Sequence, residues 1–136
     1  MQLEMRMNSL FDELKARVVD GIDGLYLAIV QDSGSDEVLM TAFMNRESLE
    51  LTLETGVMHY YSTNRRRLWR KGESSGNTQE VVEVYVDCDG DALLFKVKQK
   101  GGACHMGYRS CFYRRLDEDE LKTTQERVFN PAEVYT

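Results

Sequence analysis

The sequence predicts an α+β domain made mainly of antiparallel β hairpins with short flanking helices. Short runs rich in β-branched and aromatic residues follow one another, and Gly- or Asp-containing turns separate them. Only a few segments have helical spacing of apolar residues, and no repeat or linker interrupts the chain. At 136 residues, 42% of them hydrophobic, the chain suits one domain with its own core. The predicted domain spans residues 1–136, with a core over 38–116 and helical terminal segments at 8–20 and 117–129.

Helices are predicted at three places along the chain. Residues 8–20 place their apolar side chains on one helical face. Residues 46–55 follow Asn45, which can cap a helix, and precede Gly56, which can end one. Residues 117–129 begin with four acids, which are favourable near the positive N-terminus of a helix.

Strands are predicted over residues 24–31, 37–44, 57–63, 78–87, 91–99 and 109–116. Turns between them are marked by the polar run 32–36 and by glycines, including Asp89-Gly90, a strong hairpin signal. Sequential hairpins with few crossover helices favour antiparallel pairing.

Composition excludes several classes of protein. A net charge of −6, from 23 acids and 17 bases, argues against a general nucleic-acid binder. No apolar run approaches the roughly 20 residues that cross a membrane, and the first residues lack the apolar centre of a signal peptide. Three cysteines without a C-x-x-C pair argue against a disulfide framework and favour a reducing, cytoplasmic setting.

The bases are concentrated in two stretches that contain no acid. One covers residues 65–71 and the other covers 92–116, which holds six bases. Two basic patches in an acidic chain indicate attraction of a small anion rather than a long polyanion. The alternative is that both are solvated strand edges and loops, where Lys and Arg discourage aggregation.

Cys88, Cys104 and Cys111 form the first candidate site. Thiolates bind zinc strongly, and three protein ligands with one open position are typical of a catalytic zinc. The spacing C-x15-C-x6-C lacks the close pairs of structural zinc sites, so small buried hydrophobes are the alternative. The glycines at 101–102 and the basic surroundings of Cys111 favour a metal site, because they allow close approach and stabilise thiolate.

Asp87, Asp89 and Asp91 form the second candidate site. In an extended strand, alternate residues face one side, so the three carboxylates would converge. Such crowding is repulsive without a hard cation, and Mg²⁺ prefers oxygen ligands of this kind. A simple hairpin around Asp89-Gly90 is the alternative, and it is compatible with a metal site.

The two histidines receive different interpretations. His105, beside Cys104, is a candidate general acid or base or a fourth zinc ligand. His59 lies in an apolar stretch and is interpreted as structural.

Residues 67–79 combine bases, one tryptophan and a loop of glycines and hydroxyl side chains. Such a segment can bind phosphate and stack on a base, and a flexible hairpin loop is the alternative. The candidate substrate-binding residues are Arg67, Trp69, Arg70, Lys71, Ser74, Ser75, Gly76, Asn77 and Arg109.

Three strings resemble one family, phosphoribosyl-AMP cyclohydrolase, which opens a purine ring in histidine biosynthesis. They are RLWRKGESSGN (67–77), DCDGDALL (87–94) and GGACHMGYRSCFYR (101–114). The likeness runs from residue 38 to 116, which is 79 of the 136 residues. About 20 residues follow it, so the pyrophosphohydrolase domain that continues many relatives is expected to be absent.

The resemblance implies a homodimer whose subunits share zinc. Cys88 from one chain would join Cys104 and Cys111 of the other, and Mg²⁺ would lie on the three aspartates. The implied substrate, 1-(5-phosphoribosyl)-AMP, carries two phosphates, which match the two basic stretches. Zinc would activate water for attack at C6 of the purine ring, and His105 would move a proton while the C6–N1 bond breaks.

Two other functions are alternatives to this one. A zinc nucleobase deaminase needs H-x-E and P-C-x-x-C, and neither string is present. A zinc-stapled nucleotide-binding module without catalysis stays open, and it would take its fourth ligand from His105.

Overall fold

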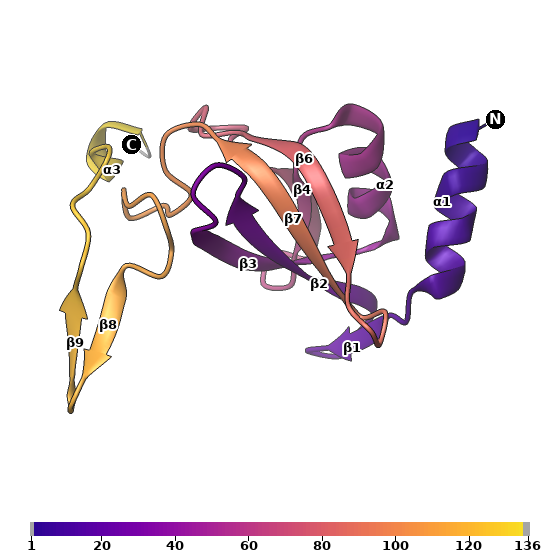
Figure 1. The fold of residues 1–136 in the computed structure, drawn as a ribbon, viewed down its shortest axis with the longest axis horizontal. Helices are drawn as coiled ribbons and strands as arrows, with labels where there is room; N and C mark the ends of the chain where they lie inside the picture. Colours follow the sequence, from indigo (N-terminus) through magenta and orange to yellow (C-terminus); the bar gives the residue numbers. More distant parts are fainter. Residues whose placement is uncertain (1, 135–136) are drawn as a thin grey trace.

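The computed structural model describes residues 2–134, with side chains from residue 7 onward. Figure 1 shows one large sheet with helices α1 and α2 toward one end and a separate hairpin at the other. The elements are α1 (Gln2–Glu13), β1 (Arg17–Val19), β2 (Ile22–Asp32), β3 (Val38–Met44), α2 (Arg46–Thr55), β4 (His59–Ser62), β5 (Arg67–Arg70), β6 (Gln79–Val86), β7 (Ala92–Gln99), β8 (Arg114–Asp117), β9 (Glu120–Thr123) and α3 (Pro131–Val134).

The main sheet has seven strands in the order β5-β4-β3-β2-β7-β6, and β1 pairs with β2 outside this path. Every pair is antiparallel except β2 with β7, which run parallel. The predicted antiparallel α+β class is therefore confirmed for most of the sheet. The parallel pair was not predicted, because it joins segments separated by four strands and a helix.

The core lies on one face of this sheet. Alternate residues of β2 and β7, such as Ala28 and Phe95, are fully buried, as the two-residue period of a strand requires. Leu49 of α2 is also fully buried. Leu10 and Phe11 of α1 are partly buried and pack against the same cluster.

Helix α2 confirms the helix predicted over residues 46–55. The Asn45 side chain accepts from the Ser48 backbone N–H at 2.8 Å, and the Ser48 hydroxyl accepts from the Asn45 N–H. Gly56 ends the helix with a φ of 77°, a left-handed conformation that glycine adopts without strain. Both capping residues bond to residues no more than four positions away, so the sequence alone was enough to predict this helix.

The predictions for both ends of the chain need correction. Helix α1 ends at Glu13, and residues 17–19 form a strand because Arg17 and Val19 pair with β2. The helix predicted over 117–129 is wrong. Asp117 ends β8, Glu118 takes a positive φ of 56° in the turn, and β9 follows. Leu116 pairs directly with Leu121 across this hairpin.

The strands predicted over 24–31, 37–44, 57–63, 78–87 and 91–99 are confirmed as β2, β3, β4, β6 and β7 with small changes at their ends. The strand predicted over 109–116 is mostly wrong, because residues 100–113 are irregular and only 114–117 pair. Strand β5 was not predicted, since its bases resembled a phosphate-binding loop. None of the described helices has the length and apolar composition to span a membrane.

Candidate functional site

A cavity of about 820 Å³ lies beside strands β3, β4 and β5. One side is formed by β5 and the loop that follows it, and another by the irregular segment after β7. The lining residues are Met40, Ala42, Phe43, Tyr61, Ser62, Thr63, Arg65, Arg67, Trp69, Arg70, Lys71, Gly72, Glu73, Ser74, Ser75, Ala103, His105, Met106, Cys111 and Pro131.

The cavity brings together half of the predicted site residues. The predicted substrate-binding residues that line it are Arg67, Trp69, Arg70, Lys71, Ser74 and Ser75. His105 and Cys111 line it as well. Gly76, Asn77 and Arg109 are not part of its wall. The side chain of Asn77 instead packs against Gly101.

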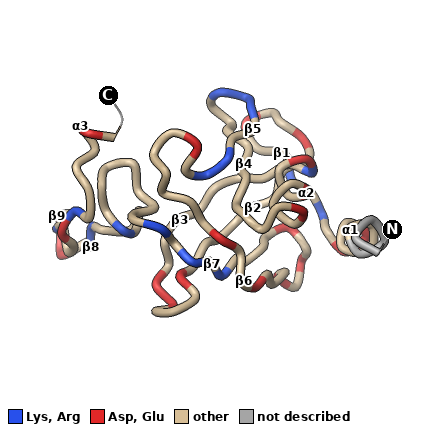
Figure 2. The backbone as a smooth tube through the Cα atoms, turned by 90° about the horizontal axis from the view of Figure 1, so that it is seen from above, with Lys and Arg blue, Asp and Glu red and all other residues tan. Residues whose placement is uncertain are grey.

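Arginines form the exposed rim of the cavity. Arg65, Arg67 and Arg70 are exposed and line it, and Figure 2 shows the basic stretch in blue beside β5. Arg67 is 3.4 Å from the Glu73 carboxylate, a surface pair that adds little stability and leaves the guanidinium accessible. The rim therefore presents positive charge to an anionic ligand.

Trp69 forms part of the cavity wall, and a buried aromatic side chain holds its ring in place. Its ring packs against Tyr60, with centroids 5.0 Å apart. Tyr60 is fully buried, and its hydroxyl donates to Gln79 Oε1 at 2.5 Å; burial raises the pKa of Tyr60 well above its usual value. Gln79 in turn donates to Gln99 Oε1 at 2.7 Å. Trp69 thus packs on a buried tyrosine that is held by hydrogen bonds, and its own side chain is only partly buried.

Lys71 connects the two sides of the cavity. Its side chain is buried, and Nζ donates to the carbonyl of Ala103 at 2.6 Å. Burial lowers the pKa of Lys71, while the nearby thiols of Cys111 and Cys104 act in the opposite direction. The ammonium group therefore positions the residue before Cys104 and lies close to both sulfur atoms.

Cys111 lines the cavity, and the buried Cys104 lies beside it. Burial raises the pKa of the Cys111 thiol to about 11; the neighbouring Cys104 thiol contributes to this rise, and Lys71 opposes it. The backbone fixes both residues, since Cys104 N–H donates to Tyr108 and Cys111 N–H donates to Leu39. Two adjacent thiols on a fixed backbone fit half of a tetrahedral zinc site.

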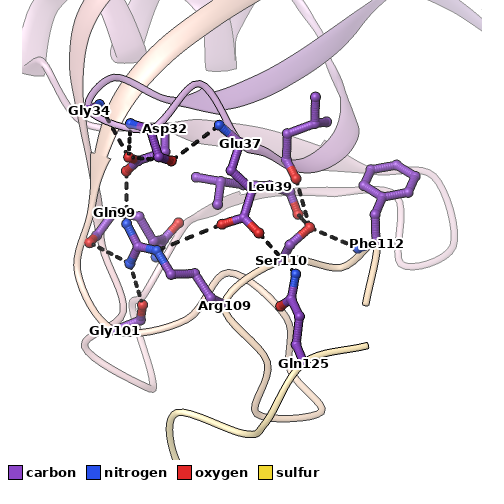
Figure 3. Close-up of polar contacts among 12 residues, drawn as sticks. Asp32, Gly34, Glu37, Leu39, Gln99, Gly101, Arg109, Ser110, Phe112 and Gln125 are labelled. Carbon is purple, nitrogen blue, oxygen red and sulfur yellow. Dashed lines mark hydrogen bonds and ion pairs between the residues drawn. The ribbon is translucent and has the colours of Figure 1, made fainter. Parts of the chain in front are cut away.

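Arg109, predicted to bind substrate, instead holds the cysteine segment in place (Figure 3). Its guanidinium donates to Asp32 Oδ1 at 2.8 Å and to the Gly101 carbonyl at 2.9 Å. Asp32 also accepts hydrogen bonds from Ser35, and its pKa is lowered. Burial, the largest influence, would raise it, but the bonds from Ser35 and the charge of Arg109 outweigh burial.

The next residue, Ser110, completes this attachment. Its hydroxyl donates to the carbonyl of Val38 at 2.7 Å, so the segment that carries Cys111 is tied to β3 (Figure 3).

The aspartates converge as predicted, but in a turn rather than an extended strand. Carboxylate oxygens of Asp87, Asp89 and Asp91 lie within 4.8 Å of one another. Asp87 Oδ1 accepts from three successive backbone N–H groups, those of Gly90, Asp91 and Ala92. The carboxylates therefore lie close together as predicted, but the geometry of a turn, not that of a strand, brings them together.

Cys88 belongs to the same turn and is exposed. Its thiol is 3.5 Å from Asp89 Oδ1, and this carboxylate raises the pKa of Cys88. Strand β7 joins this turn to the segment that holds Cys104. Eight extended residues span about 26 Å. A single chain therefore places Cys88 at one end of β7 and the other two cysteines beyond its opposite end.

Other residues complete the description of the site. Ser62, Thr63 and Phe43 line the cavity and were not predicted. Polar residues at the end of a predicted strand, next to a basic cluster, could have indicated Ser62 and Thr63; no sequence signal indicates Phe43. His59 is buried with Nδ1 2.9 Å from the Val57 carbonyl, in agreement with its structural interpretation.

Comparison with known proteins gives one consistent family. The family model of phosphoribosyl-AMP cyclohydrolase matches residues 40–113. The phosphoribosyl-AMP cyclohydrolase of Methanothermobacter thermautotrophicus is 59% identical over 119 residues, which cover 86% of each chain. That of Methanococcoides burtonii is 58% identical over 83% of this chain and 91% of its own. That of Methanocaldococcus jannaschii is 59% identical over 83% and 87%. This chain belongs to the phosphoribosyl-AMP cyclohydrolase family.

Proposed function

We propose that this chain hydrolyses the N1–C6 bond of the purine ring of 1-(5-phosphoribosyl)-AMP, the ring-opening step of histidine biosynthesis. The product is the formimino carboxamide ribotide. The observation that supports this most strongly is the cavity of about 820 Å³, which combines an arginine rim, a tryptophan wall, a histidine and the thiol of Cys111, with Cys104 beside it. These are the groups needed to bind a doubly phosphorylated purine nucleotide and to hold a metal beside it.

The substrate is bound by the rim and the wall. Arg65, Arg67 and Arg70 attract phosphate, and their fork geometry suits charge-assisted hydrogen bonds. Ser74 and Ser75 offer hydroxyl groups in the adjoining loop. The purine ring stacks on Trp69, because the exposed part of this ring faces the cavity. Arg109 is not needed for this contact, since Asp32 and Gly101 already occupy its guanidinium.

Zinc is held by Cys104 and Cys111 of one chain with Cys88 of the partner subunit. The adjacent thiols support two of these ligands, and the length of β7, which separates Cys88 from them, supports a third ligand from a second chain. Bound zinc supplies Lewis-acid chemistry that lowers the pKa of water toward neutrality. Lys71 opposes the rise in the pKa of the Cys111 thiol.

His105 exchanges the protons of the reaction. Water adds to C6, and one of its protons passes to the exocyclic nitrogen on C6. The new hydroxyl then loses its proton as the C6–N1 bond breaks, so that C6 becomes the carboxamide carbonyl and N1 gains a proton. An imidazole can perform both transfers in turn, and His105 lines the cavity next to the residue that bears one metal-binding thiol.

Magnesium is held by Asp87, Asp89 and Asp91. Their converging oxygens support a hard-cation site. Cys88 lies within this triad. The same turn would therefore supply ligands for both the zinc and the magnesium of the partner's site. Asp89→Asn should therefore change the magnesium dependence of turnover. The homodimer and a reducing cytoplasmic setting belong to the same proposal, since the three cysteines act as metal ligands rather than disulfides.

The direct test is an ultraviolet assay of purine ring opening on phosphoribosyl-AMP. Protein loaded with zinc and magnesium should turn over the substrate, lose activity with a chelator, and regain it when zinc is restored. No turnover by the zinc-loaded dimer would refute the proposal and favour the zinc-stapled binding module, in which His105 closes the site.

A further inference from the structure

The chain returns to the cavity after the β8–β9 hairpin. Residues 125–131, called here the C-terminal strap, lie against the irregular segment that follows β7, and Figure 1 shows them beside it. The backbone N–H groups of Val128 and Phe129 both donate to the Gly107 carbonyl, at 2.7 and 3.3 Å. Pro131, the last residue of the strap, lines the cavity. The strap therefore forms part of the cavity wall.

The strap is packed closely on the segment that carries the cysteines. A side chain on Gly107 would lie 2.5 Å from the Phe129 carbonyl oxygen and 3.1 Å from Pro131 Cδ. The φ of Gly107 is 97°, a conformation that also favours glycine. At the other end of the strap, the Gln125 side chain donates to the Glu37 carboxylate at 2.9 Å. The strap is thus held at both ends.

Arg127, in the middle of the strap, contacts the residues on both sides of Gly107. Its Nε donates to the Met106 carbonyl at 2.9 Å, and its guanidinium carbon lies 5.5 Å from the centroid of the Tyr108 ring. A hydrogen bond from a guanidinium is charge-assisted and stronger than one between neutral groups. Arg127 therefore fixes the backbone of this part of the segment.

His105 lies in a tight turn that this contact holds. The Gly107 N–H donates to the Cys104 carbonyl at 3.0 Å, and the Met106 N–H donates to Cys104 Sγ at 3.4 Å. His105 itself is exposed, and its imidazole makes no hydrogen bond within the part of the chain that the structure describes. The direction of the imidazole therefore depends on the backbone of residues 104–107.

The two thiols of this segment have backbone attachments of their own. The Cys104 N–H donates to the Tyr108 carbonyl at 3.1 Å, and the Cys111 N–H donates to the Leu39 carbonyl at 2.7 Å. Neither bond involves Arg127. The Arg127 side chain thus acts on His105 more directly than on the proposed zinc ligands.

We infer that Arg127 is a positioning residue for the ring-opening reaction. By holding the Met106 carbonyl, it sets the turn so that the His105 imidazole points to the substrate. Arg127 lies outside the cavity wall and outside residues 40–113, which the family model matches. A displacement of about 1 Å at a reacting group can cost about 100-fold in rate, so a bond of this kind affects turnover. This inference rests on the proposed function and adds a residue to it.

The test compares Arg127→Ala with Arg127→Lys, which keeps a positively charged donor, and with Arg46→Ala as the matched control. Arg46 also donates from Nε, to Glu50 at 2.8 Å, and also lies over an aromatic ring, that of Phe11, but it is not part of the cavity wall. We expect Arg127→Ala to lower kcat at least about tenfold, with KM and zinc content close to those of the wild type. Arg127→Lys should recover most of the loss, and Arg46→Ala should turn over substrate as the wild type does.

The imidazole signals in NMR spectra give a second readout that does not depend on activity. The chain has two histidines, and His59 is buried against a backbone carbonyl, so the two signals can be told apart. In zinc-loaded Arg127→Ala, the His105 signal should move toward that of a free histidine while the His59 signal stays in place. Neither signal should move in Arg46→Ala.

Wild-type kcat in Arg127→Ala, or a His105 signal that does not move, would overturn the inference. Loss of zinc or a shifted His59 signal in Arg127→Ala would overturn it as well, because the side chain would then support the fold rather than His105. Failure of the proposed function is recognised separately, because the wild-type, zinc-loaded dimer would then lack ring-opening activity. The NMR comparison would still report whether Arg127 places the imidazole.

Discussion

His105 is the residue on which proton transfer depends in the proposed reaction. Its side chain lines the cavity, and the one other histidine, His59, is buried against a backbone carbonyl outside it. His105→Ala should lower kcat by roughly 10²–10⁴, the usual contribution of general acid–base catalysis. Steady-state kinetics and zinc content should be measured on the same preparation. Near-normal turnover with zinc retained would refute the role.

The Asp32–Arg109 pair makes a separate prediction about stability. Because the pKa of Asp32 is lowered in the folded chain, the folded state binds its proton less readily than the unfolded state. Its stabilisation is therefore complete above the unfolded pKa of about 4 and is lost as pH falls through the lower native value. Asp32→Asn should reduce the free energy of unfolding by about 1–3 kcal/mol at pH 7.

That difference should shrink as pH falls below about 4. Urea unfolding at several pH values measures it. Asp36→Asn is the control, because Asp36 forms only an exposed pair with Lys96 at 3.4 Å and should change stability little. An Asp32→Asn effect independent of pH would contradict this account.

At the scale of residues, the chemistry that a side chain can perform was easier to predict than the residues that it contacts. The thiols, carboxylates and His105 could be proposed as site residues from the sequence because few residue types perform their chemistry. The role of Arg109 could not be predicted, because its partner Asp32 is 77 positions away in the chain. An arginine in a basic stretch looks like a phosphate ligand until its contacts are known.

At the scale of elements, the irregular segment 101–111 positions the thiols of Cys104 and Cys111, which are the proposed zinc ligands. A side chain on Gly102 would lie 2.6 Å from the Tyr108 carbonyl oxygen and 2.9 Å from Val128. Gly102→Ala should therefore displace Cys104 and weaken zinc binding at least about tenfold, since metal sites are sensitive to the groups that orient their ligands. Competition with a chromogenic chelator measures this.

Gly34→Ala is the matched control, because a side chain there makes only ordinary contact, at 3.4 Å from Asp32. It should bind zinc as the wild type does. Equal zinc affinity for both alanine variants would mean that close packing at Gly102 does not position the ligands.

Elements with local signals were predictable, and those fixed by distant contacts were not. Helix α2 has a cap at each end within its own sequence. Strands β8 and β9 occupy a segment whose acids resemble a helix start, but the pairing of Leu116 with Leu121 gives a hairpin instead. Strand β5 forms because residues 67–70 pair with β4. A basic sequence does not indicate this contact.

At the scale of the whole molecule, the sheet separates the two parts of the metal site. Strand β7 ends in the Cys88 turn on one side and leads to Cys104 and Cys111 on the other. The three cysteines lie within 24 residues of the sequence, but the strand predicted over 91–99, confirmed as β7, separates Cys88 from the other two. We therefore propose that two chains assemble one site, and this proposal is the central claim of the account.

Subunit complementation between Cys88→Ala and Cys104→Ala tests that claim most directly. Each variant alone lacks one ligand at every site and should be inactive. In a mixed dimer, one site has all three cysteines and the other lacks two. Random exchange makes half of the dimers mixed, so the mixture should recover about one quarter of wild-type ring-opening activity. No recovery, in a mixture that native mass spectrometry shows to contain mixed dimers, would contradict the account.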